Sequence, residues 1–333
     1  MEQSEKQLQE LIQKLSLLKT EIQKVIVGQD SILEEMLIAL LAGGHCLLEG
    51  VPGLAKTLMV RTMSQALHLK FRRIQFTPDL MPTDIVGTEI LEEDHSSGKR
   101  FFKFNKGPIF SNIVLADEIN RTPPKTQSAL LEAMQEFEVT YGGQTYPLDR
   151  PFFILATQNP IEQSGTYPLP EAQLDRFLLY IKIGYPTAAE ETAILSNTTG
   201  SKKATVNPVV NGEEIVALQQ MVRQVHIADE LVQWVAELIR ATRPDTSTVE
   251  YVKEWVRWGA GPRAGQALIL TAKARALFKG RYAVTMEDLR AMAHPVLRHR
   301  LLMNFKAEAE RISSDDVASH LLEAIPRPKN ALS

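Results

Sequence analysis

The chain of 333 residues has a formal net charge of −3 at pH 7 and contains one cysteine, Cys46. This charge balance excludes a strong overall attraction to nucleic acid or to an anionic membrane, and one cysteine excludes an intrachain disulfide. The first residues are charged and lack the apolar core of a signal peptide. No apolar stretch approaches the roughly 20 residues that a membrane-spanning helix needs. We therefore expect a cytoplasmic protein without a membrane span.

The first half of the chain alternates helices with short apolar strands. Apolar residues at steps of three and four predict a helix over residues 1–26, and a second apolar helix ends at the helix-stop signal Gly43-Gly44. Strands are predicted in five apolar stretches, at residues 45–49, 71–76, 111–117, 152–158 and 178–184. This alternation predicts an α/β fold with a parallel sheet that helices cover on both faces.

From residue 187 onward the apolar periodicity is almost wholly helical, and the polar, turn-rich residues 197–212 are expected to form a loop. We therefore predict two domains, an α/β core over residues 1–186 and an all-α domain over residues 187–333. A group of basic residues in the second domain is expected to form a solvated helix face. These residues are Lys273, Arg275, Lys279 and Arg281.

Two stretches of the core, residues 89–107 and 138–148, have the pattern of hairpins around Gly, Ser or Asp. The first mixes acidic with basic side chains, whereas the second carries no Lys or Arg. Both are expected to project from the α/β core. The residues alone leave open whether these are ordinary surface hairpins or functional ones.

A glycine loop, GVPGLAKT at residues 50–57, nearly matches the phosphate-binding pattern G-x-x-x-x-G-K-[ST]. The backbone N–H groups of such a loop, at the start of a helix, hold phosphate oxygens. Gly50 and Gly53 permit the tight path, Lys56 reaches the outer phosphates, and Thr57 offers a hydroxyl to Mg²⁺. The residues assigned to nucleotide binding are Gly50, Val51, Pro52, Gly53, Leu54, Ala55, Lys56, Thr57 and Leu58.

Ala55 stands where the pattern has its second glycine. Its methyl group is expected to fit an ordinary helical backbone angle, because this position already opens the following helix. Alone, the imperfect match leaves a simple glycine-rich turn equally open.

An acidic pair, Asp117-Glu118, stands at the end of the apolar strand NIVLAD. This pair favours a nucleotide-binding site over a simple turn. A strand-end Asp beside a phosphate loop holds Mg²⁺ or its waters, and the next Glu polarises a water for attack on the γ-phosphate. Two solvated carboxylates are the simpler alternative, but both motifs in this order favour a nucleotide hydrolase. The guanine element NKxD is not present, since residues 105–108 read NKGP, and ATP is therefore favoured over GTP.

These motifs together make the sequence resemble the MoxR family of AAA+ ATPases. GVPGLAKT, DEINRTPPKTQSALLEAMQE and LPEAQLDRF carry the resemblance, which covers roughly residues 20–310. It implies an AAA+ P-loop core with a C-terminal helical lid, a hexameric ring, and hydrolysis of ATP with Mg²⁺. It also implies chaperone-like remodelling, activation or metal-cofactor insertion of a client protein, often with a partner that has a von Willebrand A domain.

The resemblance assigns roles to single residues. Asn159 in ATQNP matches sensor 1, which orients the attacking water. Arg176 in LPEAQLDRF matches the arginine finger, which is presented to the γ-phosphate of the neighbouring subunit. Arg263 in GPRAG matches sensor 2, which reaches from the lid back to the phosphates.

The resemblance also reaches the adenine and the ring interior. Gly28 and Gln29 in VIVGQD match the segment beside the adenine, and Arg121 is a candidate for the subunit interface. In the family, an insert in the second helix and a hairpin before sensor 1 both face a central pore. Residues 89–107 and 138–148 fall at those places.

Two other functions remain alternatives. Related replicative helicases hold DNA with basic residues on the second hairpin, and residues 138–148 have none, which argues against a nucleic-acid motor. A nucleotide-gated scaffold with little turnover is disfavoured because Glu118, Asn159 and Arg176 are all present.

Overall fold

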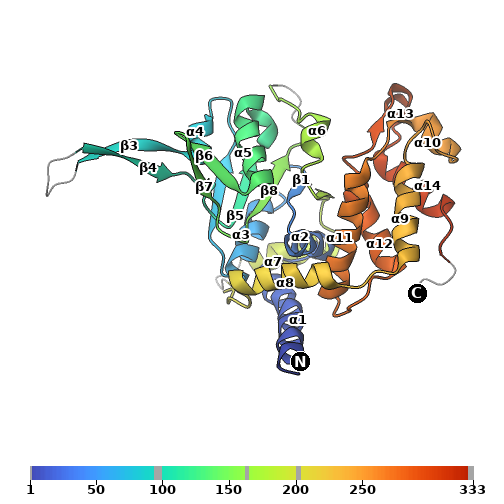
Figure 1. The fold of residues 1–333 in the computed structure, drawn as a ribbon, viewed down its shortest axis with the longest axis horizontal. Helices are drawn as coiled ribbons and strands as arrows, with labels where there is room; N and C mark the ends of the chain where they lie inside the picture. Colours follow the sequence, from blue (N-terminus) through green and yellow to red (C-terminus); the bar gives the residue numbers. More distant parts are fainter. Residues whose placement is uncertain (1, 94–99, 162–164, 200–203, 329–333) are drawn as a thin grey trace.

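The computed structural model of the chain describes residues 2–93, 100–161, 165–199 and 204–328. Its centre is a five-stranded sheet in the order β2-β5-β8-β1-β9 (Figure 1). The strands are β1 (Cys46–Glu49), β2 (Phe71–Gln75), β5 (Ile113–Asp117), β8 (Phe153–Gln158) and β9 (Leu179–Lys182). All neighbouring pairs are parallel, so the five predicted strands and the predicted parallel sheet are confirmed.

The two faces of the sheet carry separate apolar clusters, because successive residues of a strand point to opposite faces. Leu48, Leu115 and Leu155 belong to the cluster on one face, and Leu47 and Val114 belong to the other. The first face is covered by α1 (Glu2–Gln23), α2 (Asp30–Leu41) and α3 (Lys56–Ala66), and the second by α4 (Pro82–Val86) and α5 (Pro124–Glu136). The expectation of helices on both faces is therefore confirmed.

The rest of the chain is mainly helical, and its residues 229–324 lie beside the sheet, on the right in Figure 1. Its elements are α7 (Ala188–Thr198), α8 (Gly212–Gln224), α9 (Asp229–Ala241), α10 (Glu250–Trp255), β10 (Val256–Trp258), α11 (Pro262–Phe278), α12 (Met286–Leu297), β11 (Leu302–Met303), α13 (Phe305–Glu310) and α14 (Ser314–Ala324). Helix α11 packs against α8, α9, α12 and also α2 of the core. Among the described residues, no helix has the length and apolar character to cross a membrane.

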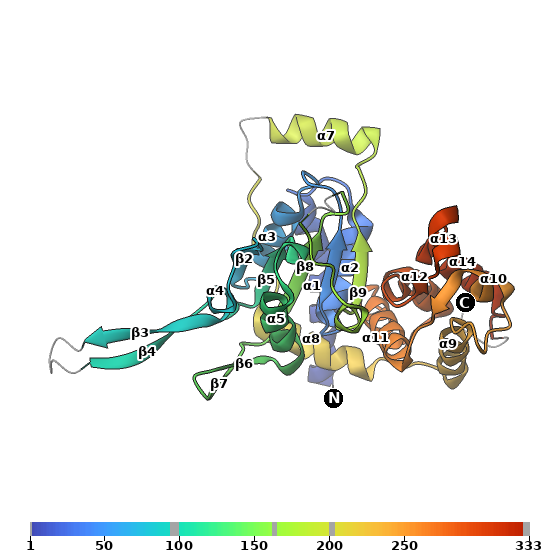
Figure 2. The ribbon, with the colours of Figure 1, turned by 90° about the horizontal axis from the view of Figure 1, so that it is seen from above.

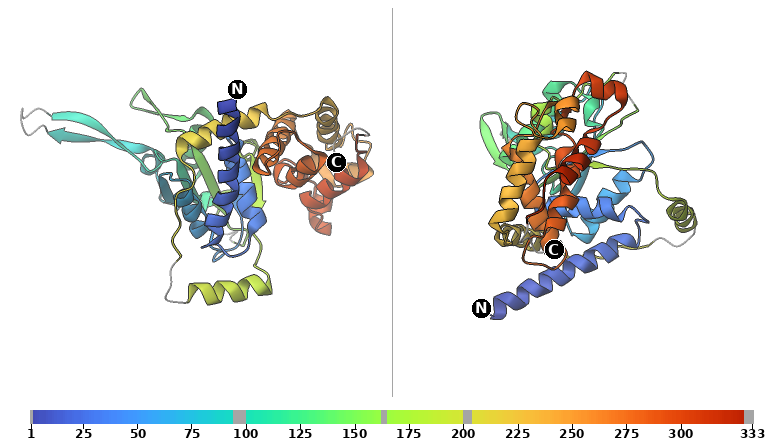
Figure 3. Two further views of the ribbon diagram at one scale, coloured as in Figure 1. Left: turned by 90° about the horizontal axis from the view of Figure 1, so that it is seen from below. Right: turned by 90° about the vertical axis from the view of Figure 1, so that its right-hand side faces the viewer.

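Helix α7 stands apart from both regions in Figures 2 and 3 and has no buried residue. The segment expected as a loop overlaps the end of α7 and the start of α8, and its residues 200–203 lie outside the described part of the chain. Helix α8 contacts both α2 and α11, so it joins the sheet region to the helical region.

Two antiparallel hairpins occur where the sequence predicts them. The hairpin of β3 (Gly87–Glu93) and β4 (Arg100–Lys106) extends far from the body, at the left of Figure 1. The second pairs β6 (Glu138–Tyr141) with β7 (Gln144–Pro147). Phe104 of the first stacks on Tyr146 of the second at a centroid distance of 4.5 Å, so the two hairpins contact each other.

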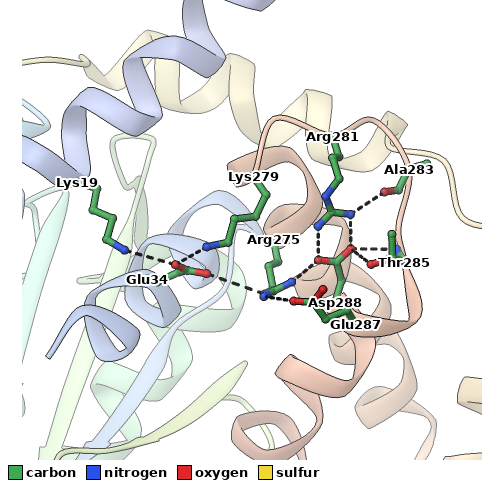
Figure 4. Close-up of polar contacts among 9 residues, drawn as sticks. All are labelled: Lys19, Glu34, Arg275, Lys279, Arg281, Ala283, Thr285, Glu287 and Asp288. Atoms are coloured by element: carbon green, nitrogen blue, oxygen red, sulfur yellow. Dashed lines mark hydrogen bonds and ion pairs between the residues drawn. The ribbon is translucent and has the colours of Figure 1, made fainter. Parts of the chain in front are cut away.

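An ionic cluster joins the core to the helical region (Figure 4). Glu34 of α2 lies 2.8 Å from Lys279 Nζ, 3.8 Å from Lys19 Nζ and 3.9 Å from Arg275 Nε. Arg275 also bonds to the fully buried Asp288 of α12 at 2.5 Å. The expectation of a solvated basic face is therefore wrong for Arg275, whose side chain is 13% exposed, because carboxylates from α2 and α12 surround it.

Glu35, the next residue of α2, faces a second group of charges from the helical region. Burial raises the pKa of Glu35 to about 7, while His294 of α12 and Arg298, which directly follows α12, act in the opposite direction. The neighbouring carboxylate of Asp315 is held by Arg298 at 2.7 Å and by Lys182 at 2.8 Å. The ionised form of Glu35 is thus unfavourable at the contact between the core and the helical region.

We predict that Glu35→Gln stabilises the chain at pH 8 and leaves its stability unchanged near pH 4.5. The folded-state pKa of about 7 lies above the ordinary 4.5, so wild-type stability falls as the pH rises between these values. The amide of Gln avoids this loss in the free energy of unfolding, which we expect to amount to about 1–3 kcal/mol at pH 8. Urea unfolding at both pH values measures the free energy of unfolding of the two proteins. Glu34→Gln is the control and should destabilise the chain, and a pH-independent effect of Glu35→Gln would contradict the assignment.

Candidate functional site

The carboxyl ends of the parallel strands meet at one edge of the sheet, where ligands commonly bind in α/β proteins. The glycine loop (residues 50–57) follows β1 at this edge, and α3 begins at Lys56. The Lys56 ammonium donates to the carbonyl oxygen of Gly50 at 2.6 Å. Burial lowers the pKa of Lys56, and the carboxylates of Asp117 and Glu118 oppose this. The loop, the lysine and the acidic pair therefore lie close together.

The backbone of Ala55 differs from the expectation. Its φ of 53° and ψ of 21° are left-handed, at the residue that caps the N-terminus of α3. The expected helical angle is therefore wrong, because the loop reverses its direction one residue before the helix begins. A left-handed conformation costs an alanine about 1–2 kcal/mol and costs a glycine almost nothing.

Asp117 ends β5 with its side chain almost fully buried. Its Oδ1 accepts from the Thr157 hydroxyl at 2.6 Å, and its Oδ2 accepts from Arg73 Nε at 3.0 Å and Nη2 at 2.6 Å. The sheet register pairs Asp117 with Gln75 of β2. The strand alternation thus places Arg73, Gln75, Asp117 and Thr157 on one face of the sheet.

Glu118 also adopts a left-handed conformation, with a φ of 57°, before the short helix η1 (Ile119–Arg121). Its backbone N–H donates to the Thr157 hydroxyl at 2.8 Å, and its Oε2 accepts from Gln75 Nε2 at 2.8 Å. Arg121 Nε lies 3.1 Å from the same oxygen, so Arg121 contacts the acidic pair of its own chain. Both acidic residues are held by side chains from the neighbouring strands β2 and β8.

The sequence interpretation missed three of these residues: Arg73, Gln75 and Thr157. A signal for them exists, because Arg73 and Gln75 are polar at alternate positions of β2, with the buried Ile74 between them. Thr157 is likewise the one hydroxyl inside the buried strand β8. Polar residues on one face of neighbouring strands indicate a site once the order of the strands is known.

Asn159 lies at the same edge as the acidic pair, directly after β8. The residue is 6% exposed, and its Oδ1 accepts from the backbone N–H of Ile161 at 3.1 Å. Strand β8 lies between β5 and β1. The structure therefore places Asn159 between the acidic pair and the glycine loop.

Arg176 lies at the opposite edge of the sheet. It precedes the amino end of β9, the neighbour of β1, and its Nη1 donates to the carbonyl oxygen of Leu131 in α5 at 2.8 Å. Arg176 lines a cavity together with Gly44 and His45, which lead into the amino end of β1. Since β1 has four residues, about 13 Å of strand separates this edge from the glycine loop.

Arg263, at the start of α11, lies beside Arg176 rather than at the glycine loop. Its Nη1 is 3.8 Å from Asp175 Oδ2, and it lines the same cavity as Arg176. Asp175 also accepts from the buried Arg300 at 2.7 Å. The structure thus brings the two candidate arginines together at the amino edge of the sheet.

Gly28 and Gln29 lie beside the first turn of α7. Both have left-handed backbones, with φ of 69° and 56°. The Glu190 carboxylate of α7, which accepts from Thr187 N at 2.8 Å, lies next to Gly28. A Cβ at Gly28 would lie 2.3 Å from Glu190 Oε1, but the end of this side chain can move, so the left-handed backbone is what favours glycine here.

The residues predicted to bind Mg²⁺ suit that ion chemically. The Thr57 hydroxyl, in the first turn of α3, and the Asp117 carboxylate are oxygen ligands, which Mg²⁺ prefers. Mg²⁺ is usually bound by one or two carboxylates together with substrate phosphates and water. This pair therefore fits a magnesium ion that a bound nucleotide helps to hold.

We predict that Ala55→Gly preserves or raises the stability of the chain, whereas Ala55→Val lowers it by about 1–2 kcal/mol. Glycine relieves the left-handed strain, and a β-branched side chain increases it. Thermal unfolding of the two variants measures the difference. Equal stability of both variants would contradict the left-handed backbone at this residue.

We predict that Thr157→Val destabilises the chain by about 2–4 kcal/mol. Valine has the shape of threonine but removes the partner of Asp117 Oδ1 and the partner of the Glu118 N–H. Thr157→Ser keeps the hydroxyl and is the matched control, for which we expect a loss of about 1 kcal/mol from the missing methyl group. Urea unfolding separates the two outcomes, and a valine variant as stable as the serine variant would disprove the bridging role.

Comparison with known proteins agrees with this geometry. Residues 45–179 match the ATPase family associated with various cellular activities (AAA), and residues 250–321 match the AAA lid domain. The second match covers α10 to α14, so the predicted helical lid is confirmed. A crystal structure assigned to an ATPase of Cytophaga hutchinsonii superposes with a TM-score of 0.91 at 41% identity and covers 98% of this chain and 99% of that one.

Two relatives extend this similarity over most of the chain. It is 44% identical over 310 residues to chaperone MoxR1 of Mycobacterium tuberculosis, across 93% of this chain and 81% of that protein. It is 30% identical over 304 residues to protein MoxR of Paracoccus denitrificans, across 86% of this chain and 88% of that protein. With both the AAA core and the AAA lid in place, this chain belongs to the MoxR family of AAA ATPases.

Proposed function

We propose that this chain binds ATP with Mg²⁺ and hydrolyses it at sites between neighbouring subunits of a ring. One observation carries the proposal: the glycine loop and Arg176 lie at opposite edges of the same sheet. An arginine that stabilises the charge of the transferring phosphoryl group must reach the γ-phosphate. Because the chain holds Arg176 away from its own loop, a second copy must supply this arginine.

Each group at the carboxyl edge has a part in this reaction. The loop amides and Lys56 hold the phosphates, while Thr57 and Asp117 hold Mg²⁺, which neutralises charge on the phosphate oxygens. Glu118 accepts the proton of the attacking water, and Asn159 orients that water. These roles are supported by the common edge at which the five side chains lie.

The groups at the other edge complete a neighbour's site. Arg176 and Arg263 line one cavity, and Arg263 lies 3.8 Å from the carboxylate of Asp175, the residue before Arg176. We propose that both arginines face the nucleotide of the next subunit. Arg263 would then act across the interface instead of on its own phosphates. The adenine would lie against Gly28 and Gln29, beside the first turn of α7.

The ring would use this cycle to remodel a client protein, to activate it, or to insert a metal cofactor into it. A protein with a von Willebrand A domain would act as a partner. The name of the relative chaperone MoxR1 supports a protein client. The absence of Lys and Arg from residues 138–148 disfavours a nucleic-acid substrate. We further propose that the ring has six subunits and that the protein is cytoplasmic. The boundary between its two domains is proposed to lie near residue 186.

Mixing two inactive variants tests the shared site. Lys56→Ala holds no nucleotide but presents its arginines, and Arg176→Ala binds ATP but loses about 10³–10⁵ in rate. We expect phosphate release to reappear on mixing and to rise with protein concentration, since some sites then combine an intact loop with an intact arginine. Arg263→Ala should complement Lys56→Ala in the same way.

The double variant Lys56→Ala/Arg176→Ala is the control, because mixing it with either single variant creates no complete site. Differently tagged chains and a pull-down show whether mixed assemblies form. Mixed assemblies whose hydrolysis equals the sum of the two inactive proteins would overturn the shared site.

A further inference from the structure

Arg73 of strand β2 holds the carboxylate that we assign to magnesium. We infer that Arg73 is a positioning residue that occupies Asp117 Oδ2 until magnesium and nucleotide arrive, and that it thereby sets the magnesium requirement of the site. The inference rests on the proposed function, and it concerns a residue outside the glycine loop and the acidic pair.

The geometry of the pair is specific. Arg73 donates from both Nε and Nη2 to the same oxygen, Asp117 Oδ2, at 3.0 and 2.6 Å. The other carboxylate oxygen, Oδ1, already accepts from the buried Thr157 hydroxyl. Both oxygens of Asp117 therefore have partners, and the oxygen that can change its partner is the one that Arg73 holds.

Burial and charge favour an exchange at this oxygen. The side chain of Asp117 is 12% exposed, so its negative charge needs a cationic partner, whereas the side chain of Arg73 is 47% exposed. A magnesium ion or its bound water at Oδ2 would lie within a few ångströms of the guanidinium, where two positive charges repel each other. The half-exposed Arg73 can turn into solvent, and magnesium then replaces it as the partner of Asp117.

The same arginine is connected to the second carboxylate. Nη2 of Arg73 donates to the amide oxygen of Gln75, and the amide nitrogen of Gln75 donates to Glu118 Oε2 at 2.8 Å. Arg73 therefore fixes the orientation of the amide that holds Glu118. When Arg73 leaves Asp117, the hold on Glu118 weakens as well, so the arrival of the metal is coupled to release of the catalytic glutamate.

The test measures nucleotide binding without turnover. A fluorescent ADP analogue is titrated onto wild type, Arg73→Ala, Arg73→Lys and Arg72→Ala at a series of Mg²⁺ concentrations. We expect Arg73→Ala to reach half-maximal binding at a Mg²⁺ concentration lower by about three- to tenfold, the effect of removing a partly exposed charged competitor. Arg73→Lys should shift less in the same direction, because an ammonium makes a single point contact.

Arg72→Ala is the matched control, since Arg72 carries the same charge on the opposite face of β2 and is exposed. We expect it to keep the wild-type magnesium requirement. A merely structural ion pair would change the unfolding temperature of the nucleotide-free Arg73 variants but not their magnesium requirement. If Arg73→Ala does not fold, Arg73→Lys provides the test. A lower Mg²⁺ concentration at half-maximal binding supports the inference, and an unchanged or higher concentration overturns it.

The possible outcomes separate this inference from the proposed function. An unchanged or increased magnesium requirement in the Arg73 variants, with normal binding by wild type, overturns the role of Arg73 alone. Loss of all nucleotide binding by wild type, with or without Mg²⁺, overturns the proposed function and this inference together.

Discussion

The common direction of the five strands is the constraint on which the rest of the molecule depends. It places the glycine loop, the acidic pair and Asn159 at one edge of the sheet and Arg176 at the other. No rotation of a side chain can bridge the length of a strand. If hydrolysis uses groups from both edges, as we propose, the reaction requires a second copy of the chain, and assembly would be part of the active site.

Buried carboxylates are the second recurring theme, because each must be compensated by hydrogen bonds or by a cation. In the site, Asp117 is compensated by Thr157 and Arg73, and at the core–lid contact Glu34 and Asp288 surround Arg275. Such contacts can exchange partners without disrupting the apolar clusters around them.

The acidic pair and the two hairpins are connected through one short path along the chain. Glu118 contacts Arg121 in η1, α5 follows η1, and β6 follows α5 directly. Phe104 then joins this second hairpin to the long β3–β4 hairpin. The acidic pair and both hairpins are thus linked by consecutive elements and one aromatic contact.

The sequence by itself determined the five strands, the glycine loop and the acidic pair, because apolar runs and the G-x-x-x-x-A-K-T spacing are local properties of the chain. It could not show that Ala55 is left-handed, since that angle depends on how the loop turns into α3. Only the tertiary structure brought Arg73 to Asp117, Arg275 to Glu34 and Arg263 to Asp175. These contacts join residues from different strands or from different domains. They follow from the sheet register and from the position of the lid, which are properties of the folded chain as a whole.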